Sequence, residues 1–232
     1  MTEQKFNSLF LVFLAALLGL GVMYLSWLRF QASFHFLPVS IAIERYHESR
    51  EIPTHRMLTL IGFAQQAISH HDHYRYHDGL SFLHYLRALD IHTPALDRRG
   101  EYRHAEAQAV EVVRRAPAQP EAWLRIAVVR SILRDEPERV LEPWRMSIFT
   151  GRTHSTLLVP RASIGLPYAD IMDAESRAML RDQLLLAWAG KPDELLRELK
   201  QLDPGLEKTG TLVGARDPAA LAEMEVRIEK IR

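Results

Sequence analysis

The chain of 232 residues contains no cysteine. Disulfide bonds, thiolate zinc sites, iron–sulfur clusters and cysteine nucleophiles are therefore excluded. Net charge is also lacking, because 29 lysines and arginines balance 29 aspartates and glutamates. Without an excess of positive charge, we expect no nucleic acid among the partners of this protein.

Signatures of catalysis and of β-structure are also missing. The sequence has no Walker loop, no dinucleotide-binding glycine motif, no nucleophile elbow and no His-Glu-x-x-His. No stretch alternates apolar and polar residues with the period of two that is typical of strands. We therefore predict an all-α fold and a protein that is not an enzyme, and we assign no catalytic, cofactor-binding or metal-binding residue.

One long uncharged run lies near the N-terminus. Ser8–Leu28 carries no charge, and as a helix it would span about 30 Å, the thickness of the hydrocarbon core of a bilayer. Tyr24 and Trp27 lie near its far end, where amphipathic rings favour the interface. We predict an uncleaved single-pass anchor, since a signal peptide would have a shorter apolar core and a small-x-small cleavage site. A buried helix of a soluble protein is less apolar than this run. Lys5 and Arg29 flank it too evenly to fix its orientation.

The segment Phe30–Ile43 is also apolar, but Pro38 interrupts it and it is too short to span a bilayer again. Packing against the soluble part of the chain is the favoured interpretation, and a position at the membrane surface is the alternative.

Helical periodicity continues through the rest of the chain. Prolines and glycines divide it, with a break expected at Pro94, a tight turn at Gly100, the end of a hairpin at Pro117 and a kink or break at Pro143. The predicted helices are Thr54–Ser69, Gly79–Asp90, Glu121–Leu133, Glu136–Phe149, Ser155–Ile164, Ala174–Ala189 after an N-cap at Asp173, Asp193–Leu202, and a last helix from Pro218.

The C-terminal part is predicted to open with a loop over Gly205–Arg216. The last helix then presents apolar residues at alternating steps of three and four, namely Leu221, Met224, Ile228 and Ile231. We favour packing of this short apolar stripe against its own domain over formation of a coiled coil with a partner.

The stretch Ala105–Gly151 has the spacing of a helical repeat. Two small residues, Ala105 and Ala109, are followed by a proline and an aromatic residue, Pro117 and Trp123. This order resembles the tetratricopeptide (TPR) repeat, whose period is about 34 residues. Since such repeats build binding surfaces, we expect a concave face that presents Arg125 and Arg130 to a partner peptide or helix.

Histidines gather between the first two predicted helices of the soluble part. On one continuous helix, His70, His73 and His77 would share a face at metal-ligand spacing. A solvated junction between helices is the favoured interpretation, because the polar run follows one helix and precedes Gly79. Two Glu-x-x-His pairs lack the further glutamates of a di-iron bundle: Glu44 with His47 and Glu101 with His104.

Two stretches in the repeat region, Val112–Ala127 and Trp144–Gly151, and two stretches after it, Leu157–Leu166 and Met172–Trp188, carry a resemblance to a known family. With the anchor in front, they resemble TPR-like single-pass membrane proteins of bacterial exopolysaccharide and O-antigen gene clusters, the VpsP-like polysaccharide biosynthesis family. The resemblance covers Glu101 to Leu199; Pro94 and the histidine-rich junction depart from the pattern. It implies an inner-membrane protein with a periplasmic soluble domain that supports polysaccharide export.

These observations predict a single N-terminal transmembrane helix followed by a TPR-like helical-hairpin domain. The expected divisions are a tail and anchor at 1–30, a juxtamembrane connector at 31–52, a TPR-like domain at 53–204, and a loop with a C-terminal amphipathic helix at 205–232.

The leading hypothesis is a non-catalytic scaffold or adaptor that contacts the lipid bilayer through its anchor and binds a protein partner in a membrane assembly for polysaccharide biosynthesis or export. One alternative is an accessory subunit of another inner-membrane complex. The other is a membrane-anchored metal-binding protein that uses the His70–His77 cluster.

Overall fold

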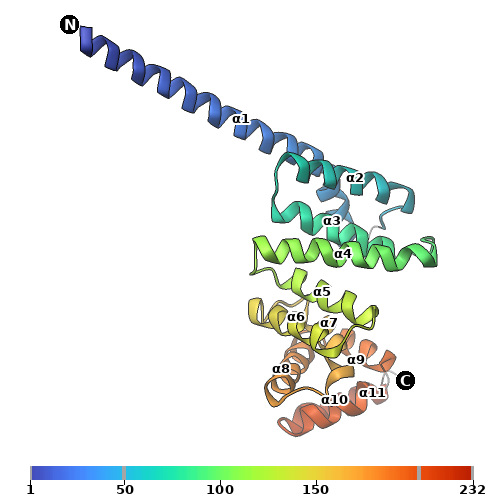
Figure 1. Cartoon of the computed structure of the whole chain (residues 1–232). Coiled ribbons are helices and arrows are strands. Elements are labelled where there is room, and N and C mark those ends of the chain that lie inside the picture. The colour runs from blue at the N-terminus through green and yellow to red at the C-terminus, as the bar shows by residue number, and fades with distance from the viewer. Residues whose placement is uncertain (1, 49–50, 203–204, 231–232) are drawn as a thin grey trace. The chain divides into compact units, whose positions relative to one another are not determined.

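The computed structural model describes residues 2–48, 51–202 and 205–230. Within these ranges the regular elements are all helices, which confirms the all-α prediction. The chain divides into two compact units, Met1–Pro94 and Ala95–Arg232 (Figure 1). The boundaries expected at residues 30 and 52 both lie inside the first unit.

The described residues of the first unit form the helices α1 (Thr2–His47), α2 (Thr54–His70) and α3 (Tyr74–Leu89). The C-terminal half of α1 packs against α2 and α3, whereas its N-terminal half projects beyond both (Figure 1). The helix predicted at Thr54–Ser69 is thus confirmed. The helix predicted at Gly79–Asp90 is also present, but it begins earlier, at Tyr74.

The expected connector at 31–52 is largely helical, because α1 continues without interruption to His47. Pro38 lies inside the helix, so the prediction that it breaks this segment was wrong. Packing explains the continuity: Ala32 and Val39 are fully buried, and Phe36 packs against the same apolar cores. Burial of a complete helical face outweighs the loss of one backbone hydrogen bond at a proline. The favoured interpretation, packing on the folded part of the chain, is confirmed.

The core of the first unit is formed by one face from each of its helices. It contains Val39 of α1, Met57, Leu60, Ile61 and Ala64 of α2, and Leu80, Leu83 and Leu86 of α3. Gly79 lies where a Cβ atom would meet the ring of Phe36 at 2.7 Å. The missing side chain therefore makes room for this ring, which tilts against Tyr76 at a centroid distance of 4.8 Å.

The second unit is a succession of shorter helices. They are α4 (Ala95–Arg115), α5 (Pro120–Ile132), α6 (Pro137–Thr150), α7 (Leu158–Gly165), the single turn η1 (Leu166–Tyr168), α8 (Ala174–Gly190), α9 (Pro192–Gln201), α10 (Gly205–Gly214) and α11 (Pro218–Lys230). As predicted, a hairpin closes near Pro117, and Asp173 caps α8 by accepting a hydrogen bond from the Ser176 amide at 2.6 Å. The helix expected from Ser155 begins at Leu158.

Two further predictions for this unit were wrong. Gly100 makes no tight turn but lies on an exposed face inside α4, where a glycine costs only about 1 kcal/mol. The expected loop over Gly205–Arg216 is mostly the helix α10. Thr209 and Val213 of α10 are buried, and α10 packs against α8, α9 and α11. This tertiary packing overrides the low helix propensity of the glycines in the segment.

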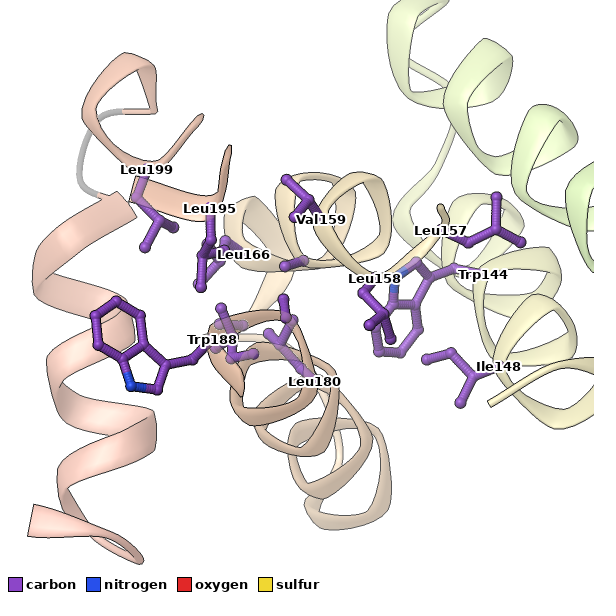
Figure 2. Packing of buried hydrophobic residues seen from close by; sticks show 14 of the residues in the cluster. Trp144, Ile148, Leu157, Leu158, Val159, Leu166, Leu180, Trp188, Leu195 and Leu199 are labelled. Carbon is purple, nitrogen blue, oxygen red and sulfur yellow. The ribbon is translucent and has the colours of Figure 1, made fainter. Parts of the chain in front are cut away.

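The core of the second unit extends from α5 to α11. It contains two tryptophans, Trp144 of α6 and Trp188 of α8, with aliphatic side chains from α6, α7, α8 and α9 (Figure 2). Met224 of α11 is 2% exposed and belongs to this core, so the last helix docks on its own unit, as expected. Ile231 lies outside the described residues.

Arg161 of α7 lies inside this core and is 0% exposed. Its Nε donates to the Ser147 hydroxyl at 3.0 Å, and its Nη1 donates to the Gly151 carbonyl at 2.8 Å and the Gln183 amide oxygen at 3.2 Å. Ser147 in turn donates to the Pro120 carbonyl at 2.8 Å. One guanidinium group therefore connects α6, α7 and α8, and through Ser147 it also reaches α5.

The surroundings of Arg161 explain how a buried positive charge is stabilised. Its guanidinium also donates to the Ser147 carbonyl, which belongs to the last turn of α6. Carbonyl groups at a helix C-terminus lack partners within the helix and form the negative end of the helix dipole. Burial lowers the pKa of Arg161 to about 10, while the charge of Glu121 acts in the opposite direction. The side chain is therefore still charged at neutral pH.

We predict that Arg161→Met destabilises the second unit by about 3 kcal/mol or more, because several buried acceptors lose their donor. Arg161→Lys keeps the charge but loses the planar fork, so a smaller loss of about 1–3 kcal/mol is expected. Urea unfolding followed by circular dichroism measures both. The matched control, Arg177→Met on the exposed face of α8, should change stability by no more than about 0.5 kcal/mol. Equal effects at both positions would contradict this role of Arg161.

Candidate functional site

From Phe10 to Trp27, α1 presents an apolar surface that no other described residue covers. Side chains from Phe10 to Trp27 are exposed, and the most apolar window of the helix buries none of its side chains. Among the described residues, α1 is the one helix long and apolar enough to cross a membrane. This result agrees with the coarse prediction of a membrane-compatible N-terminal helix.

Aromatic rings mark the point where the apolar run ends. Trp27 stacks on Phe30 at a centroid distance of 5.8 Å, and Phe30 stacks on Phe34 at 6.4 Å. All three side chains are more than half exposed. Aromatic side chains at such positions favour the interface between hydrocarbon and water. The sequence predicts an interfacial aromatic band at Tyr24 and Trp27, and the stacked rings extend this band of aromatic side chains by about two turns.

The structure separates the three histidines that were considered as metal ligands. His70 ends α2, His73 is the N-cap of α3, and His77 lies within α3, so they do not share one helical face. His70 stacks on His35 of α1 at 5.2 Å, and the Nε2 atom of His77 lies 2.8 Å from the Asp72 carboxylate. Within the described residues, no group of three histidine or carboxylate side chains is arranged to hold a metal ion.

The two Glu-x-x-His pairs lie in different units. Glu44 and His47 belong to the end of α1, and Glu101 and His104 belong to α4. The turn that was favoured over a helical metal site is present between α2 and α3, but it is shorter than expected: α3 already begins at Tyr74, and His77 is buried instead of solvated.

His73 lies in a positively charged environment. Burial lowers its pKa below 6.5, the positive charges of His71, Arg75 and Arg29 lower it further, and Asp72 acts in the opposite direction. The folded protein therefore holds this proton less tightly than the unfolded chain. By linkage, stability rises with pH between the folded pKa and the unfolded pKa of about 6.5, and the gain is complete above that range.

His73→Asn tests this linkage, because asparagine can still cap α3 but does not titrate. As pH rises from about 5 to about 7.5, we expect the wild type to gain stability relative to the variant. Urea midpoints across this range measure the difference. A difference that is independent of pH, or that changes in the opposite direction, would refute the assignment.

Arg130 holds the helices of the second unit together instead of facing a partner as expected. Its Nε donates to the Glu106 carboxylate of α4 at 2.7 Å, and its Nη1 donates to the Arg139 carbonyl of α6 at 2.9 Å. Arg125 also interacts within the chain. The expectation that Arg130 lies on a free binding face was therefore wrong.

Pro143 explains why this contact exists. In a regular helix, the amide of residue 143 would donate to the Arg139 carbonyl, but proline has no amide hydrogen. Arg130 supplies the missing donor to this carbonyl. The helix α6 continues through Pro143, so the break that was one of two expectations there does not occur.

A double-mutant cycle tests this explanation. Arg130→Gln should destabilise the protein by about 1–2 kcal/mol in the wild-type background. With Pro143→Ala present, the restored amide satisfies Arg139, and the cost of Arg130→Gln should fall by about 1 kcal/mol. Urea unfolding of the four proteins gives the coupling energy. Simple additivity would show that Pro143 and Arg130 act independently.

An exposed groove lies between α6 and α8 in the second unit. Its volume is about 370 Å³, and it is lined by Ile148, Phe149, Arg152, Glu175, Ala178, Met179 and Asp182. Phe149 is 63% exposed. At the rim, the Arg152 Nε donates to the Asp182 carboxylate at 2.9 Å, and this hydrogen bond lowers the pKa of Asp182. An apolar floor with a charged rim is typical of surfaces that bind proteins. The sequence analysis did not identify this groove.

Comparisons with models of known protein families and with curated protein sequences find no match to this chain. In the part of the chain that the structure describes, the regular elements are helices, and one of them is long and apolar enough to cross a membrane.

Proposed function

We propose that the protein is a non-catalytic adaptor that a single helix anchors in a membrane and whose helical units bind a protein partner there. One observation carries the proposal: α1 exposes an apolar surface along its N-terminal half and continues without a break into the core of the first unit. A flexible linker would leave a domain free to turn, whereas a continuous helix fixes the first unit relative to the bilayer.

The TPR-like part of the proposal concerns α4, α5 and α6. These helices follow one another through short turns, and α5 packs against both α4 and α6. Short connections favour antiparallel neighbours, as in helical-hairpin repeats. The small residues Ala105 and Ala109 are fully buried, as expected for closely packed helices. The α6–α8 groove is the surface that we assign to the partner.

The proposed cellular setting follows from the resemblance described above. It comprises a bacterial inner membrane, a soluble part in the periplasm, and an assembly for polysaccharide biosynthesis or export. The absence of cysteine agrees with an oxidising compartment but also with a reducing one. The support for this setting is therefore the likeness of the sequence segments.

Leu18→Arg is expected to release the protein from membranes, since a charge at the centre of a spanning helix costs about 3 kcal/mol. Leu58→Arg is the matched control, because Leu58 of α2 is also an exposed leucine, at 57% against 61% for Leu18. Membrane sedimentation after carbonate washing measures both. In the wild type, a C-terminal reporter that works only in the periplasm should be active. Wild-type protein in the soluble fraction would refute the anchor, and a reporter active only in the cytoplasm would refute the orientation.

For the partner, we predict that wild-type protein purified in mild detergent retains a stoichiometric protein. Phe149→Arg should reduce the retained amount by tenfold or more, because it places a charge in the apolar floor of the groove. Ile171→Arg is the control, since Ile171 is 62% exposed and lies outside the groove. Mass spectrometry of the retained protein then tests the polysaccharide assignment.

Two results would contradict these assignments. A wild-type protein that purifies alone as a monomer would contradict the adaptor function. Equal losses in the two variants would contradict the assignment of the partner to the α6–α8 groove.

A further inference from the structure

A second groove lies within the first unit, between α1 and the start of α3. Its volume is about 640 Å³, and its lining comprises Arg29, Ser33, Phe36, Leu37, Ser40, His71, His73, Arg75 and Tyr76. The lining from α1 comes from the turns that follow the apolar run. The lining from the other side comes from the turn between α2 and α3 and from the first turn of α3.

The charged side chains of this groove are all potential cations. Two arginines and two histidines line it, and no carboxylate belongs to the lining that the structure describes. Neither Arg29 nor Arg75 forms an ion pair within the described ranges. Arg75 instead contacts its neighbour Tyr74, with its Nε 3.4 Å from the hydroxyl. Asp72 is the nearby carboxylate, and it pairs with His77 at 2.8 Å. Among the described residues, the lining of the groove therefore carries positive charge and no carboxylate of its own, and Asp72 beside it offsets part of this charge.

The first turn of α3 adds to this potential. His73 caps the helix, and its Nδ1 accepts a hydrogen bond from the Arg75 amide at 3.3 Å. The N-terminus of a helix of 16 residues carries a partial positive charge. Hydroxyl groups of Ser33 and Tyr76, which lie 3.3 Å apart, supply further hydrogen-bonding groups in the same groove. Phosphate oxygens accept hydrogen bonds from such a combination of guanidinium, imidazole and hydroxyl groups.

The position of the groove on α1 indicates the source of the phosphate. Arg29 directly follows Leu28, the last residue of the apolar run, and the stacked rings of Trp27, Phe30 and Phe34 lie along one face of the helix at this level. In a bilayer these rings lie among the headgroups. The groove would then open at the depth of the lipid phosphates, next to the exposed apolar surface along which acyl chains lie.

We propose that this groove binds the phosphate of an anionic phospholipid headgroup, with the acyl chains of the lipid along the exposed apolar face of α1. The inference rests on the membrane anchor of the proposed function. Arginine binds phosphate through paired hydrogen bonds, and each cation near an anionic membrane surface contributes about fivefold in affinity. Arg29 and Arg75 lie on separate elements of one unit, so the bound lipid would connect α1 and α3 at the membrane.

Spin-labelled lipids in bilayers that contain the full chain provide the test. Electron paramagnetic resonance separates lipids held by the protein from those that move freely. We expect labelled phosphatidylglycerol to be held at least fivefold more strongly than labelled phosphatidylcholine. Arg29→Gln and Arg75→Gln should each lower this preference by about fivefold. The matched control is Arg45→Gln, an exposed arginine on the same helix, about 24 Å from Arg29 at a rise of about 1.5 Å per residue.

The outcomes separate this inference from the proposed function. If neither lipid is held and the protein does not sediment with vesicles, the membrane anchor itself is refuted. If both lipids are held equally, the anchor stands and the groove proposal fails. If Arg45→Gln lowers the preference for phosphatidylglycerol as much as Arg29→Gln and Arg75→Gln do, the preference comes from general surface charge, and the assignment of the lipid to this groove is overturned. In a final experiment, the lipid preference is measured in inorganic phosphate and compared with the preference in sodium chloride of equal ionic strength. Loss of the preference with phosphate alone would assign the groove to a soluble phosphate ligand and overturn the lipid assignment.

Discussion

The continuity of α1 is the constraint on which the rest of the account depends. One helix meets two environments, with exposed apolar side chains from Phe10 to Trp27 and, farther along, one face on which Ala32 and Val39 are buried. The change occurs within about one turn, at the level of Arg29 and the stacked aromatic rings. The helix is therefore a membrane-compatible element and a structural element of the first unit at once. The cationic groove lies at this level of α1, and the proposed anchor and the proposed adaptor function rest on the same arrangement.

In the second unit, arginines compensate for the backbone groups that its many short helices leave unpaired. Arg161 supplies donors to the carbonyl end of α6, and Arg130 supplies the donor that Pro143 lacks. Each short helix leaves four amides and four carbonyls without internal partners, so such a unit needs many of these contacts. A buried guanidinium with five donors meets this need at a low cost in volume. These arginines stabilise the scaffold that presents the α6–α8 groove.

Helix positions were predictable from the sequence wherever apolar periodicity and end signals agreed, as for α2, α5, α8 and α9. Single residues misled where packing decides. Pro38 suggested a break, although Ala32, Phe36, Val39 and Ile43 already show the spacing of a packed helical face. The glycines of Gly205–Gly214 suggested a loop, because the contacts that stabilise α10 come from distant helices. The candidate sites were harder to predict, since both grooves join segments that are separate in sequence. Arg130 was expected on a free face because the acceptor that holds it lies in another helix.

A scan of nitroxide labels along α1, from Val12 to Tyr46 in bilayers, tests the central claim most directly. Oxygen, which enriches in the hydrocarbon core, should reach labels at every position up to Leu28. From Ala32 to Ile43 the accessibility should oscillate with a period of about 3.6 residues, with minima at Ala32, Phe36 and Val39. An oscillation that stops or changes phase at Pro38, or an accessible plateau across these positions, would show that anchor and folded unit are separate elements and would contradict the account.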